Sequence, residues 1–152
     1  MEASNDFKEL LELFNAHGVE YLVVGGYALA FYGAPRFTGD LDLWVNPTPA
    51  NAGKILAALK DFGFAALGLT AGDFIKPDHV VQLGVPPLRV DLMTDIDGVT
   101  WKTGWDGKKR GEYNDIKIWF LGRREFVANK RAAGRRKDLA DIEALGKDDG
   151  KL

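Results

Sequence analysis

The sequence contains no cysteine and only two histidines and six prolines among its 152 residues. The absence of cysteine excludes a disulfide scaffold, a thiolate metal site and a thiol nucleophile. The two histidines, His17 and His79, are too few and too far apart in the sequence for an imidazole metal site. No apolar run approaches the ~20 residues that a helix needs to span a bilayer. The first fourteen residues lack the basic and apolar regions of a signal peptide, so we expect a cytoplasmic protein.

The composition is that of a globular protein, with 46% apolar and 28% charged residues. The length suits one domain, so we expect a single domain over residues 1–152. The net charge of −2 conceals an asymmetry, because residues 102–137 carry 12 Lys and Arg against four Asp and Glu, whereas the rest carries eight against 18. A basic segment of this kind is typical either of a surface that binds a polyanion or of a solvated helix face.

Hydrophobic periodicity predicts strands and helices that follow one another along the chain. Strands are expected at 21–24, 40–45, 80–85, 88–93 and 116–121. Helices are expected at 7–14, 27–32, 49–63, 123–133 and 136–145. Pro86-Pro87 predicts a turn between two of the strands, and no helix or strand is predicted over 94–115. This order predicts an α/β (α+β) fold, a small mixed β-sheet flanked by helices.

Two carboxylates on one strand face are the most informative feature of the sequence. Asp40 and Asp42 fall in the alternating run 40–45, and residues two apart on a strand point to the same face. Like charges so close together are unfavourable unless a cation lies between them. Oxygen ligands of this kind suit Mg²⁺ (or Mn²⁺), which completes its shell with water and phosphate oxygens. The pair therefore predicts a metal site for a nucleoside triphosphate (NTP); the alternative is a solvated sheet face.

A glycine pair directly follows the first predicted strand. Gly25 and Gly26 would let the backbone approach a phosphate, and they would offer amide groups at the start of the next helix. Thr38, with Arg36, leads into the acidic run and is a further candidate for nucleotide binding. Taken alone the glycine pair predicts only a turn, but beside two carboxylates it predicts a phosphate-binding site.

Asp91 is a candidate third carboxylate. It lies in the middle of the otherwise apolar strand 88–93, where a carboxylate without a partner is unfavourable. If this strand neighbours the strand 40–45, Asp91 completes a cluster able to hold two metal ions and to assist deprotonation of a nucleophile. The alternative is an Asp at the end or edge of a strand.

These residues resemble the signature of the nucleotidyltransferase (DNA polymerase beta-like) superfamily: a glycine pair, two acids two apart and a third acid on a later strand. The segment 129–141, NKRAAGRRKDLAD, is similar to the C-terminal motif of small bacterial AbiEii-type toxins and related nucleotidyltransferases. The resemblance spans about residues 21–145 and implies a nucleotidyltransferase fold. By this analogy Lys130 would contact the triphosphate, Arg135 or Lys137 would assist, and Asp138 would orient the basic side chain.

Together these features predict a metal-dependent nucleotidyltransferase with Asp40, Asp42 and Asp91 as metal-binding and catalytic residues. An acceptor hydroxyl would attack the α-phosphorus of the NTP and release pyrophosphate. The basic segment favours RNA as the acceptor, with a tRNA end as the toxin-like case; a protein Tyr or Ser, as in a toxin–antitoxin pair, and an antibiotic hydroxyl are alternatives. The competing class is a catalytically inactive module of the same fold that binds nucleotide or a partner chain.

Weaker signals lie in residues 94–115, which are polar and rich in glycine. Trp101 and Trp105 lie there among four Lys and Arg residues. Aromatic rings beside cations are typical of sites for single-stranded nucleic acid, but they also anchor loops on a core. Asp95-Ile96-Asp97-Gly98 lacks the later ligands of a calcium loop, and the sequence has neither a P-loop nor a Rossmann glycine motif.

Overall fold

The structure is a computed structural model that describes residues 5–34, 39–63, 68–84 and 89–146. Within these residues the chain forms a mixed sheet with the strand order β3-β4-β2-β1-β6-β5. The strands are β1 (Tyr21–Val24), β2 (Asp40–Val45), β3 (Val80–Leu83), β4 (Arg89–Met93), β5 (Lys109–Tyr113) and β6 (Ile116–Phe120). The pairs β1–β6 and β2–β4 are parallel, and the other neighbours are antiparallel.

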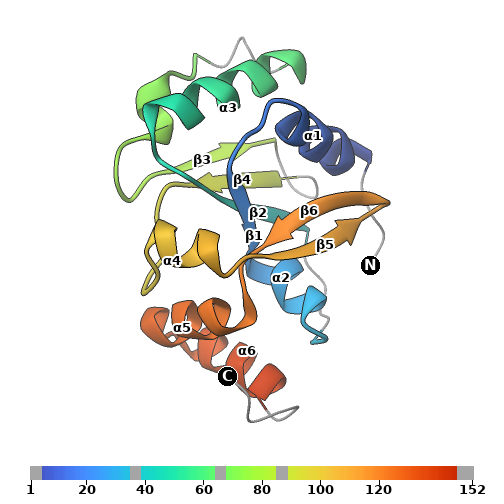
Figure 1. Cartoon of the computed structure of the whole chain (residues 1–152). Coiled ribbons are helices and arrows are strands. Elements are labelled where there is room, and N and C mark those ends of the chain that lie inside the picture. The colour runs from blue at the N-terminus through green and yellow to red at the C-terminus, as the bar shows by residue number, and fades with distance from the viewer. Residues whose placement is uncertain (1–4, 35–38, 64–67, 85–88, 147–152) are drawn as a thin grey trace.

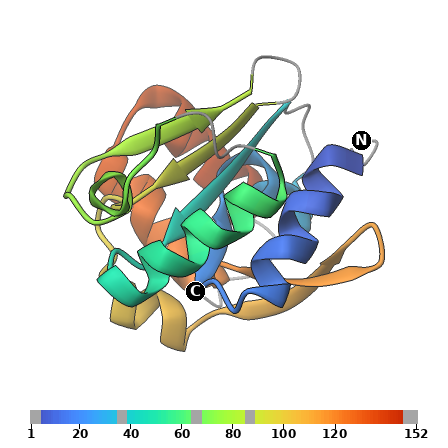
Figure 2. The same ribbon diagram turned by 90° about the horizontal axis from the view of Figure 1, so that it is seen from above.

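Helices cover both faces of this sheet, which confirms the predicted fold class. They are α1 (Asn5–Ala16), α2 (Gly25–Phe31), α3 (Pro49–Asp61), α4 (Trp101–Asp106), α5 (Arg123–Ala133) and α6 (Arg136–Gly146), with a short 3₁₀ helix η2 (Ala71–Phe74). In Figures 1 and 2, α1 and α3 lie side by side on one face. On the opposite face α5 and α6 pack together, and α2 follows directly from β1. None of the described helices combines the length and the apolar character that crossing a bilayer requires.

The alternating side chains of β2 divide the two faces as the sequence predicts. Leu41 and Leu43 are buried in the apolar core on the α1–α3 side, where Phe14 of α1 packs against Tyr21 of β1. Trp44 points to the other face together with the two carboxylates of β2. It is covered there by α4, where a Cβ at Gly104 would come within 2.7 Å of the indole ring. The buried side chain of Trp44 therefore closes one end of the face that carries Asp40 and Asp42.

Local signals account for most element boundaries. The Thr48 hydroxyl accepts a hydrogen bond from the Asn51 amide, and Pro49 occupies the first turn of α3. Gly134, with φ of 66°, ends α5 in the left-handed conformation and lets α6 begin two residues later. The predicted turn at Pro86-Pro87 lies outside the described residues, as do the flanking ends of both predicted strands.

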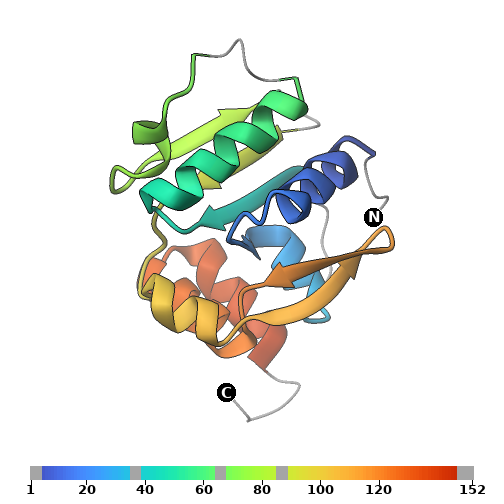
Figure 3. The same ribbon diagram turned by 45° about the horizontal axis from the view of Figure 1, so that its top comes forward.

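The structure departs from the sequence-based prediction mainly in residues 94–115, which contain α4 and β5. β5 has the sequence KRGEY and carries no apolar alternation, so only its pairing with β6 makes it a strand. The two residues between these strands, Asn114 and Asp115, both have positive φ, as a two-residue type I′ hairpin requires. The hairpin extends from the edge of the sheet in Figure 3. In addition, α2 begins at Gly25 rather than at residue 27.

Candidate active site

The turn from β1 into α2 brings the backbone against a carboxylate. Gly25 has φ of 69°, and a Cβ on it would clash with the carboxylate of Asp42. Only glycine combines this conformation with this close approach. Gly26 is buried in the first turn of α2. The glycine pair is thus the first turn of a helix that starts directly beside Asp42, and it is not a free-standing loop.

Strand register brings the third carboxylate to the other two. β2 and β4 run in parallel, with Asp42 opposite Asp91 and Asp40 opposite Arg89. Because residues two apart share a face, the three carboxylates and the guanidinium of Arg89 occupy adjacent places on one face of the sheet. Asp91 has an exposed fraction of only 9%. The expectation that the strand carrying Asp91 lies beside the strand 40–45 is confirmed.

The electrostatics of the cluster are those of crowded, partly buried acids. The pKa of Asp42 is raised to about 6, chiefly by burial and also by the charges of Asp91 and Asp40, while Arg89 and Lys130 oppose the shift. Burial also raises the pKa of Asp91, against the lowering effect of Arg89. An additional cation near these side chains would favour their charged forms.

Arg89 supplies part of that positive charge. Its Nη2 lies 2.9 Å from Oδ2 of Asp40, and its Nε lies 3.2 Å from Oδ1 of Asp91. The guanidinium therefore bridges the first and third carboxylates. In the part of the chain that the structure describes, no three Asp, Glu or His side chains converge closely enough to bind one metal ion. In this arrangement Arg89 contacts two of the three carboxylates that the sequence predicts to bind metal.

The donor set nevertheless fits a hard divalent cation. All three side chains offer carboxylate oxygens, the ligands that Mg²⁺ and Mn²⁺ prefer. Oδ1 of Asp91 is buried and has no hydrogen-bond partner. The absence of a side chain at Gly25 lets the Asp42 carboxylate lie directly against the start of α2. A bound divalent ion would supply concentrated positive charge to neutralise phosphate oxygens, and Asp40, Asp42 and Asp91 are the residues that would hold it.

A buried lysine faces these carboxylates from α5. Lys130 is 8% exposed, and its Nζ lies 3.3 Å from Oδ1 of Asp138 and 3.2 Å from Oδ2 of Asp141. Both aspartates come from α6, three residues apart and therefore on one helix face. Arg135 also donates to Asp138 through Nε at 2.7 Å. Burial alone would raise the pKa of Asp138, but the hydrogen bonds from Arg135 and Lys130 bring it below the ordinary value.

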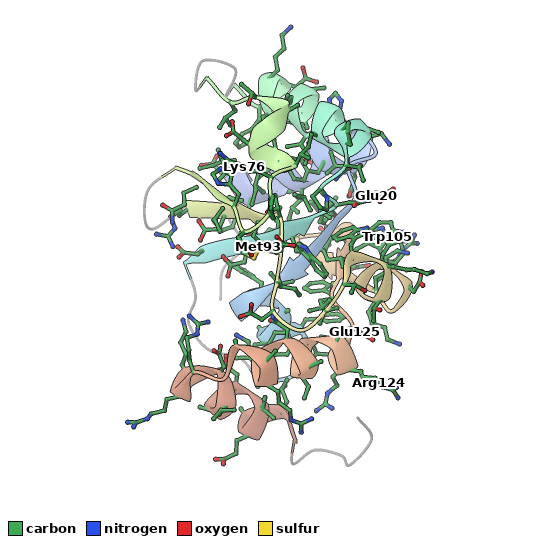
Figure 4. All side chains as sticks on the ribbon, turned by 90° about the vertical axis from the view of Figure 1, so that its left-hand side faces the viewer. Glu20, Lys76, Met93, Trp105, Arg124 and Glu125 are labelled. Carbon is green, nitrogen blue, oxygen red and sulfur yellow. The ribbon has the colours of Figure 1, made fainter. Side chains whose placement is uncertain are left out.

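Several of these groups line one cavity of about 370 Å³, a volume in the range of small-ligand sites. Of the predicted site residues, it brings together Gly25, Gly26, Asp40, Asp42, Lys130 and Lys137. Asp91, opposite Asp42 on the neighbouring strand, does not itself line the cavity. Thr38 lies outside the described residues. Met93, labelled at the level of the sheet in Figure 4, forms part of the floor.

The turn of residues 95–98 forms another wall of the cavity. A Cβ at Gly98 would come within 2.6 Å of the Cβ of Ala132, so only glycine lets this turn pack against α5. The Asn129 side chain donates a hydrogen bond to the carbonyl of Asp97. These contacts hold α5, and with it Lys130, against the turn that follows β4.

Comparison with known proteins gives no match to a protein-family model and none to a curated protein sequence. Among solved structures, a candidate nucleotidyltransferase from Thermotoga maritima is similar with a TM-score of 0.59 at 16% identity, over 94% of this chain and 89% of the other. The lincosamide antibiotic adenylyltransferase LnuA, bound to lincomycin, is similar with a TM-score of 0.55 at 14% identity, over 93% and 95%. The chain has a nucleotidyltransferase fold.

Within this nucleotidyltransferase fold, Arg89 and Asp141 contact predicted site side chains but were not themselves predicted from the sequence. Arg89 lies two residues before Asp91 on the same strand, so the period of two already placed its side chain on the carboxylate face. Asp141 lies one helical turn after Asp138, and that spacing already placed both on one side of α6. For Arg89 the signal in the sequence was a basic residue two positions from an aspartate on a strand. For Asp141 it was a second aspartate one helical turn from Asp138.

The tryptophans of residues 94–115 are engaged within the chain. The ring of Trp105 stacks on that of Trp101, with 5.5 Å between the ring centroids. Nζ of Lys108 lies 4.1 Å from the centroid of the Trp105 ring. Trp101 in turn packs edge-on against Trp44 in the core. This arrangement favours the anchoring role over a nucleobase-stacking site, because the rings already have aromatic and cationic partners.

Proposed function

We propose that this protein is a metal-dependent nucleotidyltransferase that moves a nucleoside monophosphate from an NTP to an acceptor hydroxyl. The observation that carries the proposal is the cavity itself. A helix start made of two glycines and two strand carboxylates line one side of it, a buried lysine lines the other, and the surrounding fold is that of nucleotidyltransferases. Phosphate-binding amides, metal-binding oxygens and an ammonium group are the three requirements of a triphosphate site.

Each residue has a distinct proposed role. Asp40, Asp42 and Asp91 hold Mg²⁺ or Mn²⁺, and the backbone of Gly25 and Gly26 lies against the phosphates. Lys130, with Lys137 at the mouth of the cavity, neutralises the triphosphate. The acceptor oxygen forms a bond to the α-phosphorus, the bond from that phosphorus to the bridging oxygen breaks, and pyrophosphate leaves. Asp91 takes the proton of the acceptor hydroxyl, a role that its burial and raised pKa support.

For the acceptor we propose RNA, with a tRNA end as the specific candidate. The support is the charge of residues 102–137, which include the exposed side chains of Lys102, Lys109, Arg124 and Arg131. A toxin–antitoxin setting, with a protein Tyr or Ser as the acceptor, is the alternative suggested by the AbiEii-like segment 129–141. LnuA acts on a lincosamide antibiotic, so an antibiotic hydroxyl is a third acceptor to test.

A catalytically inactive module is the second candidate function. The specific observation in its favour is that Arg89 bridges Asp40 and Asp91 and that no three metal-binding side chains converge in the described ranges. Such a module would bind an NTP without turning it over.

A labelling experiment distinguishes the two functions. The protein is incubated with each α-labelled NTP, Mg²⁺ or Mn²⁺, and in turn total RNA, tRNA, cell protein and lincomycin. Transfer of label by the wild type, and its loss in Asp40→Asn and Asp42→Asn, supports the enzyme. Glu9→Gln, an exposed substitution on α1, serves as the matched control. Equal labelling by the two site variants and the wild type would refute the assignment, whereas NTP binding without labelling would favour the inactive module.

A further inference from the structure

We infer that Arg89 competes with the divalent cation for the carboxylates of this site and must leave Asp40 and Asp91 before the metal binds. The inference rests on the proposed metal-dependent function and assigns a role to a residue outside the glycine, aspartate and lysine set. Arg89 is then a positioning residue, because it acts on the metal through the two aspartates. Its side chain offsets part of the negative charge of the acidic cluster in the metal-free protein.

The geometry of the guanidinium supports this role. Nη2 lies 2.9 Å from Asp40 Oδ2 and 3.3 Å from Asp91 Oδ2, while Nε lies 3.2 Å from Asp91 Oδ1. One planar cation thus contacts an oxygen of the first carboxylate and both oxygens of the third. These are oxygens that a divalent ion would need, and the register of β2 with β4 fixes their position. The two cations therefore require the same ligands.

Arg89 cannot resolve the conflict by losing its proton, because a guanidinium stays charged at every physiological pH. A divalent ion and a guanidinium within a few ångströms repel each other strongly in a partly buried site. The arginine side chain must therefore rotate away. Such a movement is feasible because its side chain is 30% exposed, as is about a third of the Asp40 side chain.

The contacts of Arg89 are also weaker than those of a structural ion pair elsewhere in the chain. Nη2 of Arg89 donates one long hydrogen bond of 3.3 Å to Oδ2 of Asp91. Nε of Arg89 and Oδ1 of Asp91 are buried 3.2 Å from each other, yet neither of these two atoms makes a hydrogen bond. By contrast, Arg135 donates to Asp138 with Nε at 2.7 Å and Nη2 at 3.2 Å, both as hydrogen bonds. Fewer and longer hydrogen bonds than in the Arg135–Asp138 pair are what a displaceable counter-ion should show.

This competition has a consequence for the order of binding. Displacement of Arg89 costs free energy, and this cost lowers the net affinity of the carboxylates for a metal ion. The free ion therefore binds weakly. A metal ion that arrives with a triphosphate brings further ligands and negative charge, which offset this loss. The site then holds its metal mainly when nucleotide is present.

A direct titration tests the inference, with Mn²⁺ binding measured by electron paramagnetic resonance in the absence of nucleotide. In Arg89→Met the competing charge is gone while the aliphatic stem is kept, so we expect Mn²⁺ to bind about tenfold more tightly than in the wild type. Arg89→Lys keeps a charge that cannot bridge both aspartates, so we expect a smaller increase. Arg110→Met removes an exposed guanidinium that stacks on Trp119 and should leave the affinity unchanged.

The opposite result has a clear meaning. If Arg89 holds the aspartates in a metal-ready arrangement, Arg89→Met and Arg89→Lys will bind Mn²⁺ more weakly than the wild type, and the inference is overturned. Equal affinity in all the proteins overturns it as well. If neither the wild type nor any variant binds Mn²⁺, with or without an NTP, the proposed metal-dependent function fails too. Arg89→Lys keeps the test informative should Arg89→Met fail to fold.

Discussion

Asp42 is the residue at which the proposed activity opposes the stability of the fold. Burial, together with the charges of the neighbouring Asp91 and Asp40, raises its pKa to about 6. The pKa of this carboxyl is higher in the folded than in the unfolded state. Its contribution to stability is therefore fully present only at a pH below the unfolded-state pKa, which is near 4. That contribution is lost as the pH rises through about 6. At neutral pH and without metal, the fold therefore holds a carboxylate in a place that disfavours its charge.

Replacement of this carboxylate by an amide should separate the two properties. We expect Asp42→Asn to abolish nucleotidyl transfer and yet to raise the free energy of unfolding at pH 7.5, without metal, by about 1–2 kcal/mol. Thermal unfolding between pH 4.5 and 8 measures this, and the variant should lose less stability than the wild type as the pH rises through about 6. A variant that is less stable than the wild type at pH 7.5 would contradict the assigned environment of Asp42.

Gly25 tests the close approach of backbone and carboxylate. In Gly25→Ala the new Cβ would meet the Asp42 carboxylate, and the residue would also keep a positive φ. We expect a loss of about 2–4 kcal/mol in the free energy of unfolding, together with loss of activity. The matched control is Gly33→Ala, where φ is 96° but nothing lies within 4 Å. In the control, the free energy of unfolding should fall only by the cost of the backbone strain, about 1–2 kcal/mol. Equal losses in the two variants would show that the clash with Asp42 is unimportant.

At the scale of elements, the α5–α6 pair holds a buried lysine at a fixed point of the cavity. The Lys130 ammonium donates a hydrogen bond to Asp138 and forms an ion pair with Asp141, so it keeps donor capacity for a ligand. Asp138 also accepts a hydrogen bond from the Arg135 amide at the start of α6. The same side chain thus stabilises the helix start and orients the lysine.

Removal of one carboxylate from this arrangement should affect nucleotide binding more than the chemical step. For Asp141→Asn we expect the KM for NTP to rise several-fold with a smaller change in kcat, and the free energy of unfolding to fall by about 1–3 kcal/mol. Steady-state kinetics and thermal unfolding measure the two effects. Asp106→Asn, which removes only the exposed pair with Lys102, should change neither by much. A loss of stability with an unchanged KM would restrict Asp141 to a structural role.

The elements differ in how well the sequence predicts them, and the reason is where each one obtains its stability. β1, β2 and α5 carry their own apolar pattern and end signals, and their predicted bounds agree with the structure. α4 is six residues long and is held by packing on Trp44, and β5 is a polar edge strand held by β6. Contacts from distant parts of the chain decide both, and a local pattern does not contain that information.

At the scale of the whole molecule, the candidate site is assembled from segments that are about 100 residues apart in the sequence. Alternation along β2 was enough to predict that Asp40 and Asp42 share a face, and the isolated Asp91 was enough to predict a third member. The bridge by Arg89 and the burial of Lys130 depend on strand order and on the docking of α5. The resemblance of segment 129–141 pointed to Lys130, but its double contact with α6 is a tertiary feature.

The central claim is that the three aspartates hold a divalent ion against a bound triphosphate. Anomalous diffraction at the manganese edge tests it most directly, with crystals of the wild type grown in Mn²⁺ and a non-hydrolysable NTP analogue. We expect a manganese peak coordinated by Asp40, Asp42 and Asp91, with the triphosphate between Gly25-Gly26 and Lys130. Clear density for the analogue in the cavity without manganese at these carboxylates would contradict the claim.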